Sequence, residues 1–103
     1  YADKIITEYI ADIVNATRNP NDYDLDLENM IEFGASPRAS IWLMRTAKAN
    51  ALLNGRGFII PEDVKAVAHE VLRHRIILTF EAEANGINPD KVIDFVLEKI
   101  SPP

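Results

Sequence analysis

The residues best suited to chemistry lie in segment 34–40, just before a long apolar stretch. Ser36 is expected to cap a helix there, because a serine hydroxyl accepts a hydrogen bond from a free amide of the first turn. Pro37 suits the first helical position, where its missing N–H costs nothing. Gly34 allows the preceding chain to adopt a backbone angle that other residues avoid. The pattern predicts a helix that starts at Pro37 and carries Arg38 in its first turn.

Arg38 is unusual at a helix start, because the positive end of the helix dipole disfavours a cation. The free amides of a first turn bind anions, and a guanidinium adds a planar, permanently charged fork that fits phosphate oxygens. One interpretation is therefore a helix start that faces a phosphate. The alternative is an ordinary exposed arginine that pairs with one of the many nearby carboxylates.

Outside this segment, no group of side chains matches a known kind of catalytic or metal site. His69 and His74 are five residues apart, whereas two metal ligands on one helix face need a spacing of three or four. The acids between Asp22 and Glu28 lack the central glycine and the spaced glutamate of a calcium loop. The chain has no cysteine, and no serine stands with a base as a nucleophile requires. We expect no metal and no catalytic residue in this chain.

Four helices are expected to position the segment around Arg38. Apolar residues at helical spacing predict helices over 2–17 and 37–54, one that starts at Pro61 and one that starts at Pro89. The first helix is expected to bury Ile5 together with its other apolar residues. Two short apolar runs, 58–60 and 76–80, leave room for one minimal pair of strands between them. The predicted fold is all-α, a small four-helix bundle in a single domain.

The central helix, 37–54, has few polar positions, so other helices are expected nearly to surround it. Its few polar residues fall mostly on one edge: Arg38, Arg45 and Lys48 lie along one strip at 100° per residue, with Ile41 and Leu52 beside them. This edge is the best candidate for an inter-domain or inter-subunit surface, with Arg45 and Lys48 as its interface residues.

Charge is distributed unevenly along a chain whose net charge is −5. Residues 33–61 hold four basic side chains and no acid. This basic segment could face a small polyanion such as ATP or an acidic neighbouring surface, or the acidic flanks could neutralise it. The overall acidity argues against nucleic acid as a partner. No apolar run approaches the ~20 residues that span a bilayer, and there is neither a signal-peptide pattern nor a cysteine, which fits a cytoplasmic chain.

Three segments resemble the C-terminal helical lid subdomain of MoxR-type AAA+ ATPases. They are GASPRA at 34–39, LNGRGFIIPEDV at 53–64 and VLRHRI at 71–76, and the resemblance extends over nearly all of residues 1–103. In that family the arginine of the Ser-Pro-Arg motif is the sensor-two residue, which reaches the terminal phosphate of the nucleotide. The resemblance assigns this role to Arg38 and places Ser36, Pro37 and Ala39 beside it in the nucleotide-binding region.

The resemblance also implies partners and a cofactor. A parent protein of this type binds ATP with Mg²⁺, assembles into a hexameric ring and acts as a chaperone-like remodeller, often beside a protein with a von Willebrand A domain. The lid would contact an upstream AAA+ core and neighbouring subunits. This chain contains no Gly-x-x-x-x-Gly-Lys phosphate loop, so it should not hydrolyse ATP alone. Since it begins with tyrosine, we expect a fragment of a longer ATPase.

Two functions remain open from the sequence. The first is a nucleotide-sensing lid that couples ATP binding and hydrolysis to remodelling of a partner protein. The second is a stand-alone acidic helical module that binds other proteins and has no nucleotide role. A helix-turn-helix DNA reader is disfavoured, because no helix carries the basic and amide side chains that read base edges.

Overall fold

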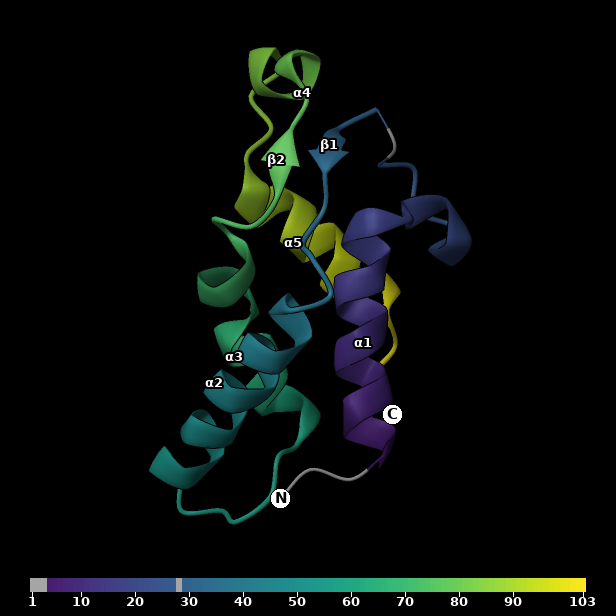
Figure 1. The fold of residues 1–103 in the computed structure, drawn as a ribbon. Helices are drawn as coiled ribbons and strands as arrows, with labels where there is room; N and C mark the ends of the chain where they lie inside the picture. Colours follow the sequence, from purple (N-terminus) through teal and green to yellow (C-terminus); the bar gives the residue numbers. More distant parts are fainter. Residues whose placement is uncertain (1–3, 28) are drawn as a thin grey trace.

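The computed structural model of the chain describes residues 4–27 and 29–103 and confirms an all-α fold with one small pair of strands (Figure 1). The elements are α1 (Lys4–Arg18), the 3₁₀ helix η1 (Pro20–Tyr23), β1 (Ile31–Phe33), α2 (Ala39–Leu53), α3 (Pro61–Leu72), β2 (Ile77–Leu78), α4 (Phe80–Ala84) and α5 (Pro89–Lys99). The four long helices correspond to the four predicted ones, and α4 corresponds to the helical turn that the sequence predicts over residues 81–85, closed by Gly86. No helix in 4–27 or 29–103 is long and apolar enough to cross a membrane.

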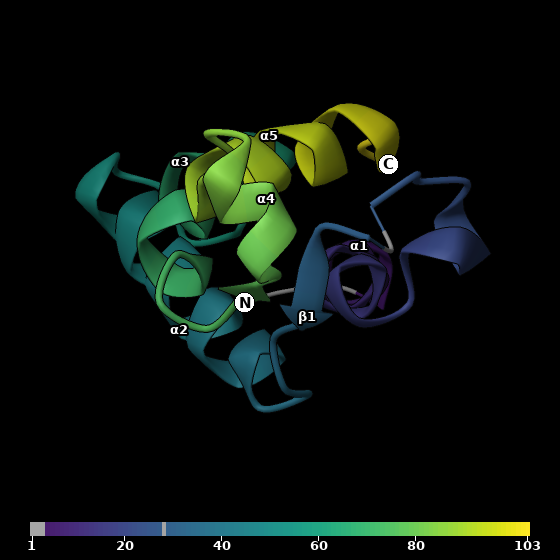
Figure 2. The same ribbon diagram turned by 90° about the horizontal axis from the view of Figure 1, so that it is seen from above.

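The core forms where α1 contacts α2, α3 and α5, while α2 packs along α3. Figure 2 shows α1 nearly end-on, with α2 on one side of it and η1 on the other. Burial follows the predicted apolar stripes of α3 and α5, but Ile5 of α1 is exposed, so the expectation that it is buried was wrong. The fully buried large apolar side chains are Ile10, Ile13, Val14, Leu43, Val64, Leu72, Val92, Ile93 and Val96.

The strands pair differently from the expectation. β1 runs antiparallel to β2, with Ile31 opposite Leu78 and Phe33 opposite Ile77. The predicted partner of β2, segment 58–60, is not a strand. The reason is geometric: segment 58–60 precedes α3 and β2 follows it, and a helix of 12 residues holds its ends about 18 Å apart.

Helix starts combine predicted and unpredicted caps. Asn88 precedes Pro89 and Asp90, a pattern that predicts a capped helix start, and its side chain does accept a hydrogen bond from the Lys91 amide at 2.9 Å. At α3, Ile60 cannot cap through its side chain. Instead, the Asp63 carboxylate accepts a hydrogen bond from the Ile60 amide at 2.9 Å. The start of α3 is therefore capped in the reverse direction, by a residue inside its first turn.

Candidate functional site

Segment 34–38 crosses the C-terminal end of α1 before it enters α2. At Gly34 the two backbones meet so closely that a Cβ atom would lie 2.2 Å from the Thr17 carbonyl oxygen. The backbone of Gly34 is not in the left-handed region, so the expectation of an unusual backbone angle was wrong. Glycine is required here because any side chain would collide with α1.

Thr17 holds the same segment by a hydrogen bond. Its buried hydroxyl donates to the Val14 carbonyl at 2.7 Å and accepts from the Ala35 amide at 3.0 Å. Ala35 is itself fully buried. The last turn of α1 therefore fixes the chain three residues before Arg38, through one hydrogen bond and one close backbone contact.

The start of α2 differs in detail from the prediction. The helix begins at Ala39, and residues 36–38 form a turn that leads into it. The Ala39 amide donates to the Ser36 carbonyl at 2.9 Å and the Ser40 amide to the Pro37 carbonyl at 3.1 Å. Within the described ranges the Ser36 hydroxyl makes no hydrogen bond, so the predicted side-chain cap is wrong: backbone carbonyls satisfy these amides.

With no cap from Ser36, Arg38 is the residue at this helix start that can still bind an anion. The amides of residues 39–41 already donate to the carbonyls of residues 36–38, so they do not form a free cradle for an anion. Arg38 is exposed, and it has no ion pair within residues 4–27 and 29–103. The nearby carboxylate that the alternative interpretation required is thus not found there. The guanidinium is available to an external anion.

Arg45 and Lys48 of α2, together with Arg38 just before it, lie on a side of the helix that residues 4–27 and 29–103 leave uncovered. Arg45 and Lys48 are exposed like Arg38, and the Arg45 guanidinium lies 5.6 Å from the centroid of the Trp42 ring. Trp42 is 48% exposed and Leu53 is 87% exposed. The expectation that other helices nearly surround α2 was therefore wrong for the described residues, 4–27 and 29–103. We call this surface the α2 strip: Arg38, Ile41, Trp42, Arg45, Lys48, Leu52 and Leu53.

Sequence reasoning placed the cations and Ile41 on this surface but missed Trp42 and Leu53. On a helical wheel these two residues fall about 40° and 60° from Arg38, at 100° per residue. Their positions were therefore available from the sequence. What the sequence did not show is that no other described segment of the chain covers this side of the helix.

A buried carboxylate organises the far end of α2. Asp63, which is 1% exposed, accepts hydrogen bonds from the Asn50 side chain at 2.9 Å and from the Ile60 amide, and it pairs with Arg56. These contacts join the C-terminal half of α2, the loop 54–60 that follows it and the start of α3. The network therefore links α2 to α3 at the end of α2 opposite Arg38.

Two polar pairs join α3 to α5. The Arg73 guanidinium donates to Asp90 at 2.8 Å, and this hydrogen bond holds the pKa of the Asp90 carboxyl below its ordinary value. His69 lies 2.6 Å from Asp94. The four side chains are exposed or half-buried, so each pair contributes only weakly to the packing of α3 against α5.

Comparison with known proteins adds an independent finding. A family model described as the AAA lid domain matches residues 24–95. Chaperone MoxR1 of Mycobacterium tuberculosis (strain ATCC 25618 / H37Rv) is 41% identical over 99 residues, which are 95% of this chain and 26% of the relative. Protein MoxR of Paracoccus denitrificans is 39% identical over 84 residues, 77% of this chain and 25% of the relative.

The fold of this chain is also similar to that of a solved structure. The crystal structure of a candidate ATPase from Cytophaga hutchinsonii ATCC 33406 superposes with a TM-score of 0.94 at 45% identity, and covers 99% of this chain and 31% of that one. The chain therefore spans about a quarter to a third of the length of the proteins that it matches.

Proposed function

Because the chain belongs to the AAA lid domain family and is the lid subdomain of a MoxR-type AAA+ ATPase, we propose that it is a nucleotide-sensing lid. In the full-length protein it would close over ATP and Mg²⁺ bound by an ATPase core. Its movement would couple ATP binding and hydrolysis to chaperone-like remodelling of a partner protein.

The observation that carries this proposal is the state of Arg38. It is exposed and lacks an ion pair in the described segments, while Thr17 and Gly34 hold the chain just before it in place. A guanidinium can form two parallel hydrogen bonds with oxygens of a terminal phosphate. ATP has that phosphate and ADP does not, so the contact exists in only one state of the cycle. The lid would then favour different positions with the two nucleotides.

The α2 strip supports the second half of the proposal. Exposed apolar side chains in a contiguous group mark surfaces that other proteins cover. Trp42 and Leu53, with Arg45 and Lys48 between them along α2, would contact the ATPase core or a neighbouring subunit of a ring. Arg38 immediately precedes α2, so a nucleotide-dependent movement of the lid would move Arg38 and this surface together.

The same apolar surface also fits a protein-interaction module with no nucleotide role, so the test must separate the two. We would compare kcat/KM for ATP hydrolysis by the full-length protein and its Arg38→Ala variant, with Lys91→Ala as the control. Lys91 is likewise an exposed cation without an ion pair in the described residues.

A nucleotide-sensing lid predicts that the Arg38→Ala variant loses about tenfold to a hundredfold in kcat/KM for ATP, the equivalent of one charge-assisted hydrogen-bond contact. Its free energy of unfolding should change by less than about 0.5 kcal/mol, as for other surface sites, and the Lys91→Ala variant should retain normal activity. Equal activity of both variants and the unmodified protein would favour the interaction module.

A further inference from the structure

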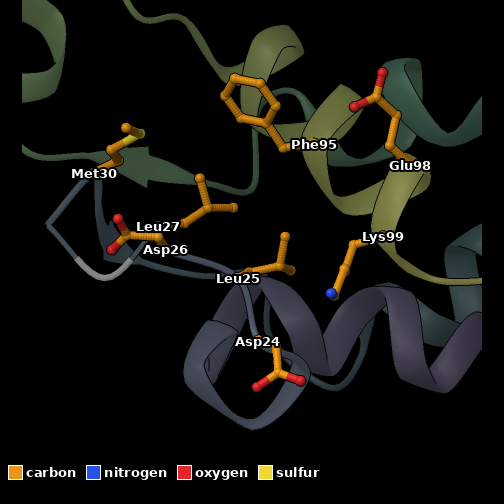
Figure 3. A pocket seen from close by; sticks show the side chains of 8 residues that line it. All are labelled: Asp24, Leu25, Asp26, Leu27, Met30, Phe95, Glu98 and Lys99. Atoms are coloured by element: carbon orange, nitrogen blue, oxygen red, sulfur yellow. The ribbon is translucent and has the colours of Figure 1, made fainter.

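A groove on another part of the surface lies between segment 24–27 and the C-terminal half of α5 (Figure 3). Its volume is about 420 Å³, within the range of about 300–1,000 Å³ that is typical of ligand-binding clefts. The floor is apolar: Leu25 and Leu27 point toward α5, and the Phe95 ring closes the groove from the α5 side. The two leucines are buried and the phenyl ring is half-buried.

The mouth of the groove is acidic. In segment 24–27 the side chains alternate, so that Asp24 and Asp26 point outward while the leucines point inward (Figure 3). Glu98 stands on the opposite side, and Lys99 is the one cation among the lining residues. None of these four charged groups forms an ion pair in the parts of the chain that the structure describes. Three carboxylates against one ammonium leave the mouth with a net negative charge.

We propose that this groove binds a short segment of a partner protein in which Lys or Arg residues stand next to aliphatic ones. The aliphatic side chains would cover the apolar floor, and the cations would meet Asp24 and Asp26 at the mouth. Charge complementarity selects this occupant. A phosphate-bearing ligand would be repelled by the carboxylates, and an acidic peptide likewise.

The groove is separate from the surface assigned to the nucleotide. α1 lies between α2 and segment 20–27 in both views of the fold (Figures 1 and 2), and the groove and the α2 strip share no residue. The charges of the two surfaces are also opposite. A partner bound in the groove would leave Arg38 accessible, so this inference stands or falls independently of the nucleotide role.

The test measures binding of labelled eight-residue peptides to the full-length protein by fluorescence anisotropy at about 0.15 M salt, where long-range attraction is screened. The probe alternates Leu and Lys. One comparison peptide replaces Leu with Ser and another replaces Lys with Glu. The protein variants are Asp24→Asn/Asp26→Asn and the control Glu81→Gln/Glu83→Gln, which makes the same change of charge on exposed residues of α4. Asparagine suits position 24, whose φ of 56° is left-handed, because it tolerates that region.

We expect the Leu–Lys peptide to bind at least about tenfold more tightly than either comparison peptide. The Asp24→Asn/Asp26→Asn variant should weaken its binding by about tenfold, the combined loss of two ion pairs, and the α4 variant by less than about twofold. Equal binding of the Leu–Lys and Ser–Lys peptides would overturn the role of the apolar floor. Equal weakening by both double variants, or no binding of the Leu–Lys peptide, would overturn the proposed site.

Discussion

Replacement of Gly34 by alanine should destabilise the fold more than any other glycine-to-alanine change in the chain. The added Cβ would lie 2.2 Å from the Thr17 carbonyl oxygen, 2.5 Å from its carbon and 2.7 Å from the Arg18 nitrogen. All three atoms belong to the backbone of α1, so no side chain can rotate away. Segment 34–35 must therefore move, and the hydrogen bond between the Ala35 amide and Thr17 is lost.

The expected cost has two parts. Overpacking costs about 1–3 kcal/mol, and a buried amide and hydroxyl that lose their bond add about 1–3 kcal/mol. A total of about 2–6 kcal/mol would lower the melting temperature of a domain of this size by at least about 8 °C. Thermal and urea denaturation of the Gly34→Ala variant, followed by far-UV circular dichroism, would measure this loss.

Two other glycines supply matched controls. A Cβ at Gly57 would meet nothing within 4 Å, so Gly57→Ala should change the free energy of unfolding by less than about 0.5 kcal/mol. Gly55 also has open space, but its φ is +78°, so Gly55→Ala should lose about 1 kcal/mol through backbone strain alone. The reasoning would be refuted if the Gly34→Ala variant were as stable as the Gly57→Ala variant.

Three further substitutions test individual contacts by the same denaturation measurements. The Tyr9 hydroxyl is buried without a hydrogen-bond partner in the described residues, so Tyr9→Phe should stabilise the fold by about 1 kcal/mol. Burial also raises the pKa of Tyr9 above 10.0, with a smaller contribution from the charge of Glu62. The unfolded chain therefore loses this proton first, and the resulting fall in stability above pH 10 should be smaller in the Tyr9→Phe variant. Asp63→Asn should lose about 2–3 kcal/mol, because a buried charged acceptor is removed; a loss below 0.5 kcal/mol would contradict the network. Thr17→Val should destabilise the fold by about 1–2 kcal/mol and lower ATP hydrolysis by the full-length protein, while Thr17→Ser should restore both.

The elements that the sequence predicted well are those whose signals are local. The apolar stripes of α3 and α5 recur at helical spacing, and Asn88 followed by Pro89 marks the start of α5. Each signal involves residues within a few positions of one another. The structure confirms them because the local preference and the tertiary packing agree.

The features that the sequence did not show depend on contacts between distant segments. The prediction that β2 pairs with segment 58–60 was wrong, because a run of apolar residues does not show which strand it pairs with. The sequence suggested that Gly34 is needed for an unusual backbone angle. Glycine is required there because the backbone of Thr17, 17 positions earlier, leaves no room for a side chain. In the sequence Asp63 is simply an acid in the first turn after Pro61. Its contacts with Asn50 and Arg56 involve other elements, so only the fold reveals them.

The exposed side of α2 illustrates a different limit. Trp42 and Leu53 are apolar and recur at helical spacing, as the buried residues of α2 do. The pattern of apolar residues alone therefore indicated that α2 is surrounded. Their exposure is visible only in the fold of this chain, which spans a quarter to a third of the proteins it matches. The side chains that a helix buries depend on every segment that packs against it, including segments outside the chain.

The central claim is that Arg38 distinguishes ATP from ADP. The most direct test is calorimetric titration of the full-length protein and its Arg38→Ala variant with ADP and with a non-hydrolysable ATP analogue. A contact with the terminal phosphate predicts that the variant binds the ATP analogue about tenfold to a hundredfold more weakly, while its affinity for ADP changes by less than about twofold. Equal losses for both nucleotides, or no loss for either, would contradict the claim.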